Sequence, residues 1–168
     1  MLGCRLIGVL DPRGADRQKL IVWVEIDRCM TDALSAVTGV RLGKRSLKFF
    51  DYGKVAATFL NLAEGVSYRV SAREESRVLA EERFPHLASK KERQMAAYSE
   101  AAEEELFKVE RVRVKLRDSD LPGRPRSRVF CAHCLEGVND SREVIREDGR
   151  TLCRTCSDGG YYTNLPEN

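Results

Sequence analysis

The sequence predicts an α+β fold with three parts: an α-β-α-β-β-β core with a mixed sheet, a helical extension, and a small C-terminal ribbon that is rich in cysteine. Two observations lead to this prediction. Helical and strand patterns alternate over the first 72 residues, and two Cys-x-x-Cys pairs lie between residues 131 and 156. A chain of 168 residues has room for one modest domain and such a ribbon.

The first three elements alternate between helix and strand. Apolar residues in 2–10 follow helical spacing with no N-cap before them, so we expect the chain to begin inside a helix. Residues 20–26 form a β-branched and aromatic run that is typical of a buried strand. The apolar residues of 30–37 then share one helical stripe, with Asp27 or Thr31 as N-cap and Gly39 at the C′ position.

Three short β-type segments follow, at 47–52, 56–62 and 66–72, with Gly53 and Gly65 between them. Short strands separated by turns predict an antiparallel meander. Together with the earlier elements they predict a mixed sheet with helices on one face.

Charged helical patterns replace the strands after residue 73. Residues 74–83 read as a helix that ends before Pro85, and residues 89–107 as a longer helix capped by Ser89. The apolar stripe of the longer helix is narrow, so it packs either on a partner subunit or on its own domain. The stripe of this helix consists of Met95, Tyr98, Ala102 and Leu106. After the helix, the sequence predicts a strand over 112–116 with a basic face.

The two Cys-x-x-Cys pairs predict a metal site. Their separation of eighteen residues leaves room for a hairpin over 142–152, with Asp-Gly as its turn. Four thiolates leave no open coordination position, so we expect a structural Zn²⁺. Two disulfides or a redox-active pair are the alternatives. The expected ligands are Cys131, Cys134, Cys153 and Cys156.

Composition argues against several classes of function. A formal charge of +3, with 33% charged residues, is too mild to indicate a nucleic-acid partner by itself. The longest apolar run, Leu20 to Val24, is far shorter than a membrane span. The start of the chain lacks a basic leader, so we expect a reducing cytoplasm. No phosphate loop or nucleophile elbow supports a stand-alone enzyme.

A second candidate site lies where the first strand ends and the next helix begins. Cys29 would occupy the first turn of that helix, whose positive end favours a thiolate, and Asp32 would share its face. Glu25 and Asp27 alternate along the end of the strand. A thiolate with carboxylates can form part of a second metal site. The alternative is a small buried cysteine, capped by an ordinary acidic turn, that binds no metal.

Two loops carry candidate contacts for an anionic ligand. Tyr52 and Lys54 flank Gly53 at a turn, and Arg41 and Lys44 belong to a basic cluster after the second helix. A carboxylate or phosphate would suit both loops. Ordinary turn chemistry and a solvent-facing cluster are the alternatives.

Four segments, in order, resemble the formylmethanofuran dehydrogenase E-subunit family: EIDRCMTDA at 25–33, VTG at 37–39, LGKR at 42–45 and DYGKVAATF at 51–59. The resemblance extends to about Ala72 and includes the four-cysteine ribbon. It implies an α-β-α-β-β-β core, a C-terminal zinc ribbon and, in many members, a homodimer. Some members occur beside the molybdenum or tungsten enzyme that reduces CO₂ onto methanofuran, which makes such an oxidoreductase a candidate partner.

The chain departs from this family at its start. Members typically carry a His-Gly-His-x-Cys-Pro-Gly-like motif that faces the cysteine corresponding to Cys29. Here the two histidines are His86 and His133. We therefore expect Met1 to lie inside the family's first helix, so that Cys29 and Asp32 form half of a pocket.

The expected domain organisation follows from these points. Residues 1–73 form the α+β domain of the E-subunit type with a truncated first helix, 74–116 the helical extension and strand, 117–128 a linker, 129–157 the zinc ribbon and 158–168 a tail.

The favoured interpretation is a metal-binding accessory or redox-associated protein with a structural zinc ribbon. The alternative is a regulatory zinc-ribbon protein that contacts nucleic acid or a polymerase through the basic stretch at 111–128. The ribbon itself is not basic and lacks interleaved aromatic residues, so nucleic acid is not the expected partner.

Overall fold

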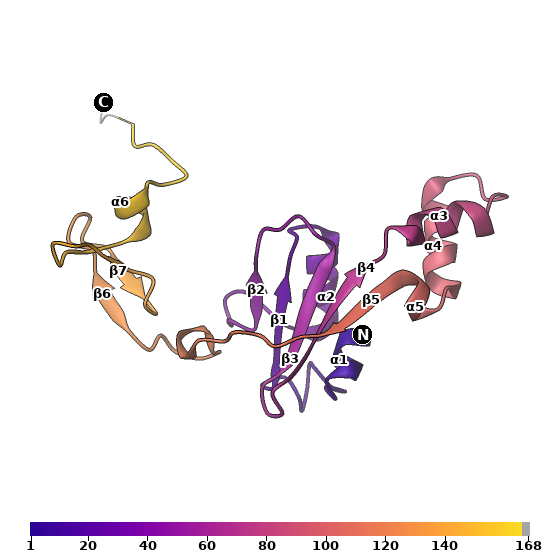
Figure 1. The fold of residues 1–168 in the computed structure, drawn as a ribbon, viewed down its shortest axis with the longest axis horizontal. Coiled ribbons are helices and arrows are strands. Elements are labelled where there is room, and N and C mark those ends of the chain that lie inside the picture. The colour runs from indigo at the N-terminus through magenta and orange to yellow at the C-terminus, as the bar shows by residue number, and fades with distance from the viewer. Residues whose placement is uncertain (166–168) are drawn as a thin grey trace. The chain divides into compact units, whose positions relative to one another are not determined.

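The computed structural model describes residues 1–165, which divide into two compact units, Met1–Lys115 and the segment that starts at Leu116 (Figure 1). The last three residues of the expected tail, 166–168, lie outside the described part of the chain. None of the helices in residues 1–165 combines the length and the apolar character that a membrane span requires.

A five-stranded mixed sheet forms the centre of the first unit, with the strand order β2-β1-β3-β4-β5 (Figure 1). β1 and β2 pair in parallel, and the other neighbours in this order pair antiparallel. The predicted α+β class with a mixed sheet is confirmed. The strands are β1 (Leu20–Val24), β2 (Leu47–Phe49), β3 (Ala56–Asn61), β4 (Val66–Ala72) and β5 (Phe107–Arg111).

One face of this sheet carries the hydrophobic core. Because side chains alternate along a strand, Val22 and Val24 of β1 point to the same face as Phe59 of β3. Cys4 of α1 and Leu34 of α2 pack against these residues, so both helices cover the same face, as predicted. The two helices are α1 (Leu2–Leu6) and α2 (Cys29–Thr38).

The pairing of β2 differs from the predicted meander. β2 runs parallel to β1, with Leu47 opposite Val22, and it has no place beside β3 in the strand order. The reason is the helix between them: α2 carries the chain back, so β2 runs in the same direction as β1. Of the three segments predicted as a meander, β3 and β4 are antiparallel neighbours, and β3 pairs on its other side with β1.

Three helices separate β4 from β5. Ser89 caps the middle one as predicted: its Oγ accepts a hydrogen bond from the Glu92 N–H, and the Glu92 carboxylate accepts one from the Ser89 N–H. The predicted helix 89–107 is interrupted, because Ala101 and Ala102 are extended. The strand predicted over 112–116 is also wrong: β5 occupies 107–111, directly after the short last helix, and residues 112–116 form no strand. The helices are α3 (Glu75–Arg83), α4 (Lys90–Glu100) and α5 (Glu103–Leu106).

The second unit contains two short antiparallel hairpins. β6 pairs with β7, and β8 pairs with β9 at the position predicted for the Asp-Gly hairpin, where Gly149 has a φ of 81°. Its elements are η1 (Asp118–Asp120), β6 (Arg128–Phe130), β7 (Gly137–Asn139), β8 (Val144–Ile145), β9 (Thr151–Leu152) and α6 (Arg154–Asp158).

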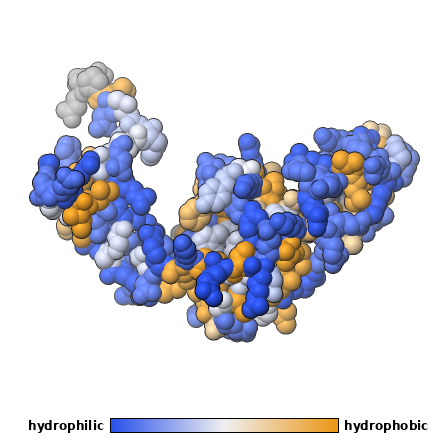
Figure 2. Space-filling model, viewed as in Figure 1, coloured by the Kyte–Doolittle hydropathy of each residue, from blue (hydrophilic) through white to orange (hydrophobic). Residues whose placement is uncertain are grey.

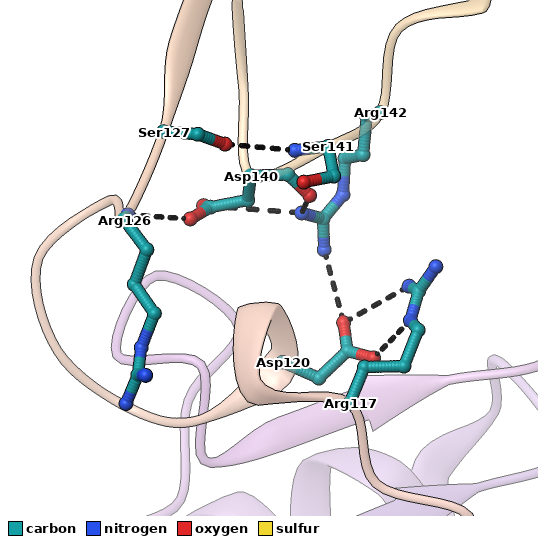
Figure 3. A network of polar contacts seen from close by, with 7 residues as sticks. All are labelled: Arg117, Asp120, Arg126, Ser127, Asp140, Ser141 and Arg142. Carbon is teal, nitrogen blue, oxygen red and sulfur yellow. Dashed lines mark hydrogen bonds and ion pairs between the residues drawn. The ribbon is translucent and has the colours of Figure 1, made fainter.

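A network of polar contacts fastens the first hairpin of this unit to the segment before it (Figure 3). The buried Asp140 carboxylate accepts a hydrogen bond from the Arg126 N–H at 2.9 Å. The Arg142 guanidinium donates to the Asp140 carbonyl and to the Asp120 carboxylate, which Arg117 also holds. The segment predicted as a linker therefore contains several fixed contacts with the ribbon.

Candidate metal centre

The four predicted ligands lie at the ends of the two hairpins. Cys131 directly follows β6, and Cys134 lies in the turn toward β7, where Leu135 has a φ of 63°. Cys153 directly follows β9 and is the N-cap residue of α6, which contains Cys156. Each Cys-x-x-Cys pair, or knuckle, therefore combines the end of a strand with a tight turn. This geometry brings the two cysteine side chains of the pair to the same side of the backbone.

The four sulfur atoms converge. All four Sγ atoms lie within 4.8 Å of one another, and the Sγ atoms of Cys134 and Cys153 are 3.9 Å apart. Among the described residues, this is the one group of three or more histidine, cysteine and acidic side chains with such a spacing. The sequence prediction that these cysteines form one cluster is confirmed.

Backbone N–H groups point at two of the sulfur atoms. The His133 N–H donates to Cys131 Sγ, and the Cys156 N–H donates to Cys153 Sγ, each at 3.4 Å. Hydrogen bonds from the backbone of Cys134 and Cys153 lower the pKa of Cys131 to about 6. Such bonds favour the thiolate, the form that binds a metal.

The pKa values of Cys134 and Cys156 shift in the opposite direction, above the ordinary value of a thiol. The neighbouring thiol of Cys153, followed by burial, raises the pKa of Cys156 to about 12. Four sulfur atoms at this spacing cannot all be negative without a counter-charge, because like charges raise one another's pKa. A bound cation removes that conflict, since coordination deprotonates a thiol outright.

The arrangement favours metal binding over the alternatives. None of the six cysteines, all of which lie in the described residues, forms a disulfide. The 3.9 Å between the sulfur atoms of Cys134 and Cys153 is far longer than an S–S bond of about 2.05 Å. Four convergent sulfur ligands can hold a metal ion in a closed, structural site.

His133 lies beside this cluster. Its Nδ1 atom is 3.6 Å from Cys156 Sγ. The imidazole is therefore within hydrogen-bonding distance of one of the four sulfur atoms that could hold a metal ion.

The second candidate site has a different geometry. Cys29 is the first residue of α2 and is exposed, and the side chains of Asp27 and Asp32 also reach the surface. Arg28 is the N-cap residue and gives no side-chain cap, so neither Asp27 nor Thr31 caps the helix as predicted. Thr31 instead donates its hydroxyl to the Ile26 carbonyl at 2.5 Å.

Glu25 is held away from these surface side chains. Arg69 of β4 donates from Nε and Nη2 to its two carboxylate oxygens, at 2.7 and 2.8 Å. The hydrogen bond from Arg69 is the main reason that the pKa of Glu25 lies below its ordinary value. The structure therefore does not gather Glu25, Asp27, Cys29 and Asp32 into one ligand set.

The candidate anion contacts lie in two separate loops. The backbone N–H groups of Tyr52 and Lys54 both donate to the Glu25 carbonyl, at 3.2 and 3.1 Å, which places this turn beside the end of β1. Arg41 and Lys44 are exposed in the loop between α2 and β2, where the Arg41 N–H donates to Ser46 Oγ.

Sequence reasoning missed the role of Arg69 and a nearby cavity. Arg69 interrupts an otherwise plain strand pattern with a charge, and that is the signal that it has a partner inside the sheet. The cavity, of about 210 Å³, lies on the core face between α1 and α2, with Met30, Leu34 and Phe59 in its wall.

Comparisons with known proteins place this geometry in context. The family model for FmdE, described as belonging to the molybdenum formylmethanofuran dehydrogenase operon, matches residues 1–116. The crystal structure of a tungsten formylmethanofuran dehydrogenase FmdE-like protein from Syntrophus aciditrophicus is similar, with a TM-score of 0.55 and 23% identity. The similarity covers 94% of this chain and 82% of that one, and at this identity it concerns the fold. The comparison with curated proteins gave no match.

Proposed function

Because the chain belongs to the FmdE family, the E-subunit family of formylmethanofuran dehydrogenase, we propose that it is a metal-binding accessory protein whose four-cysteine cluster holds a structural Zn²⁺. The observation that carries this proposal is the convergence of four sulfur atoms within 4.8 Å. Zinc is the metal that a closed set of four thiolates most commonly binds in a structural site.

The accessory role concerns a molybdenum or tungsten oxidoreductase: the family description names a molybdenum formylmethanofuran dehydrogenase operon, and the similar crystal structure is described as tungsten formylmethanofuran dehydrogenase E-subunit-like. The proposal includes a homodimer in a reducing cytoplasm, where thiols remain free to bind metal. It does not include catalysis by this chain alone. A second metal ion near Cys29 stays a prediction.

The structure weakens the case for the nucleic-acid alternative. Arg117 pairs with Asp120, and Arg126 lies 3.9 Å from Asp118, so part of the basic stretch is neutralised within its own unit. Arg142 is also shared between Asp120 and Asp140 (Figure 3). Fewer free cations remain to contact phosphates than the composition indicates.

Metal content per chain tests the proposed function. Elemental analysis of protein purified without added metal is expected to find one zinc per chain in the wild type and none in Cys131→Ser. Cys29→Ser is the matched control, because it removes an exposed cysteine outside the cluster. Its zinc content is expected to equal that of the wild type.

Two other results would change the proposal. A second metal that survives Cys131→Ser and disappears in Cys29→Ser would establish a functional site at the start of α2. A wild-type protein without metal would refute the zinc site.

A further inference from the structure

β5 forms an open edge of the five-stranded sheet. It is the last strand in the order β2-β1-β3-β4-β5, so β4 pairs with one side of it, and no strand within residues 1–165 pairs with the other side. The outer side of such a strand presents backbone N–H and C=O groups that can pair with a further strand.

The contacts with β4 show which backbone groups point toward this open edge. The Val112 N–H donates to the Ser67 carbonyl at 3.1 Å, and the Ser67 hydroxyl donates to the Val112 carbonyl at 2.6 Å. Both backbone groups of Val112 therefore face β4. Because these groups alternate in direction along a strand, those of Val109 and Arg111 point away from β4, toward the open edge.

One side of the edge carries a row of cations. Arg111 lies opposite Tyr68, which packs against the hydrophobic core. Exposed and half-buried residues then alternate as far as Lys115, and the exposed ones are Arg111, Arg113 and Lys115. Alternate residues of an extended chain share one side and are about 6.6 Å apart. Figure 2 shows strongly hydrophilic side chains on the part of the first unit that β5 and the residues after it cross in Figure 1.

The row is positive charge that the described part of the chain does not neutralise. Within residues 1–165, no ion pair involves any of its three side chains. On the other side of the strand, Lys108 instead pairs with Glu110 at 2.8 Å. Val109, which is 41% exposed, precedes the row on the same side as the cations. An unpaired strand edge and an unpaired row of cations therefore lie side by side.

A second extended chain satisfies both features at once. Its backbone can pair with the open edge, and acidic side chains at its alternate positions have the same spacing as the cations. β5 of a second copy does not supply these acids, because its residues on that side are apolar or basic. Nucleic acid can neutralise the cations, but it lacks the backbone N–H groups that pair with a strand.

We propose that the outer edge from Val109 to Lys115 is a docking site for an extended acidic segment of a partner protein, which adds to the sheet beside β5. This inference rests on the proposed accessory role and names a contact surface for it. It is independent of the metal, because the four cysteines lie in the other unit.

A synthetic peptide of alternating glutamate and threonine tests the charge pattern. Fluorescence anisotropy of the labelled peptide with the full chain is expected to show binding that weakens as salt rises. R111E/R113E should bind this peptide at least about tenfold more weakly, and should instead bind a peptide of alternating lysine and threonine. K90E/K91E makes the same change in net charge at exposed positions of α4, and should bind the acidic peptide as the wild type does.

Methylation of the peptide backbone tests the added strand. Two further peptides carry N-methyl groups either on the glutamates or on the threonines, so each keeps its charge but loses the donors along one edge. Only one edge of a bound strand faces β5. One of the two peptides should therefore lose most of its binding to the wild-type protein, and the other should keep it.

Four results would overturn the inference. The wild type does not bind the acidic peptide, or R111E/R113E binds it equally well. The two methylated peptides bind alike, which indicates attraction by charge without an added strand. Single-stranded oligothymidylate binds more tightly than the acidic peptide, which makes the row a phosphate-binding surface. Far-UV circular dichroism checks that each variant is folded, and zinc content of the same samples shows separately whether the proposed function holds.

Discussion

Arg69 of β4 donates hydrogen bonds to both carboxylate oxygens of Glu25 across the sheet, at 2.7 and 2.8 Å. The Glu25 side chain is 10% exposed and that of Arg69 is 23% exposed, so water screens the pair only in part. Arg69 also reaches Glu110 of β5 at 3.1 Å. One guanidinium therefore links the residue directly after β1 to β4 and β5, on the face of the sheet opposite the hydrophobic core.

Removal of one partner is expected to destabilise the first unit. Glu25→Gln or Arg69→Met should each lower the free energy of unfolding by about 2–3 kcal/mol, because each leaves a charge partly buried without its partner. The double variant should recover part of that loss. Urea unfolding measures the three values, and a double variant whose loss equals the sum of the two singles would show that the two side chains are not coupled.

The stability that Glu25 contributes should depend on pH with a defined sign. The Arg69 guanidinium holds the pKa of Glu25 below its ordinary value of 4.5. Folding therefore favours the ionised carboxylate, and the contribution is complete above the ordinary pKa and is lost as the pH falls through the lowered one.

Comparison with Glu25→Gln isolates this contribution. The difference in unfolding free energy between wild type and variant should be largest near neutral pH and shrink below about pH 4.5. The other carboxylates titrate in both proteins and cancel in the difference. A difference that stays constant as the pH falls would mean that Glu25 is not charged in the folded protein.

Local pattern predicted most of the elements, whereas contacts distant in sequence escaped it. The strand predicted over 20–26 is present over 20–24, Gly39 ends its helix in the αL conformation, and Ser89 caps its helix as predicted; all three features depend on neighbouring residues. The parallel pairing of β2 depends on how a crossover helix packs, which spacing alone does not encode. The break at Ala101 and Ala102 likewise arises where the helix must end so that β5 can pair with β4.

The two candidate sites also differ in whether local sequence is enough to predict them. The four cysteines could be predicted because each knuckle is local and the chemistry of thiolates is specific. Glu25 was grouped with Cys29 because the two are close in sequence, yet its partner is Arg69, 44 residues away. A buried carboxylate selects the nearest cation in space, and a single sequence does not show which cation that is.

Gly3 of α1 is expected to tolerate no side chain. A Cβ atom there would lie 2.2 Å from Cδ2 of Phe59, a ring that is 5% exposed and cannot move freely. Overpacking should outweigh the gain in helix propensity, so Gly3→Ala should destabilise the protein by about 1–2 kcal/mol. Thermal unfolding checks the value.

Gly43 provides the matched control for this substitution. Nothing lies within 4 Å of a Cβ atom at Gly43, and its φ lies outside the left-handed region. Gly43→Ala should be neutral or stabilise the protein by up to about 1 kcal/mol, because it restricts the unfolded chain. Equal losses at both positions would contradict the close packing of α1 on Phe59.

Removal of the metal should unfold the second unit and spare the first. The hairpins β6–β7 and β8–β9 have strands of two or three residues, too short to be stable alone in water. A structural metal contributes much of the folding free energy in such a module.

After a strong chelator is added, amide hydrogen exchange should accelerate in residues 128–158 and stay slow in β1, β3 and β4. Cys131→Ser should show the same pattern without chelator, and Cys29→Ser should resemble the wild type. If the ribbon stays protected after its metal is gone, contacts such as that between Asp140 and Arg126 hold it without the ion.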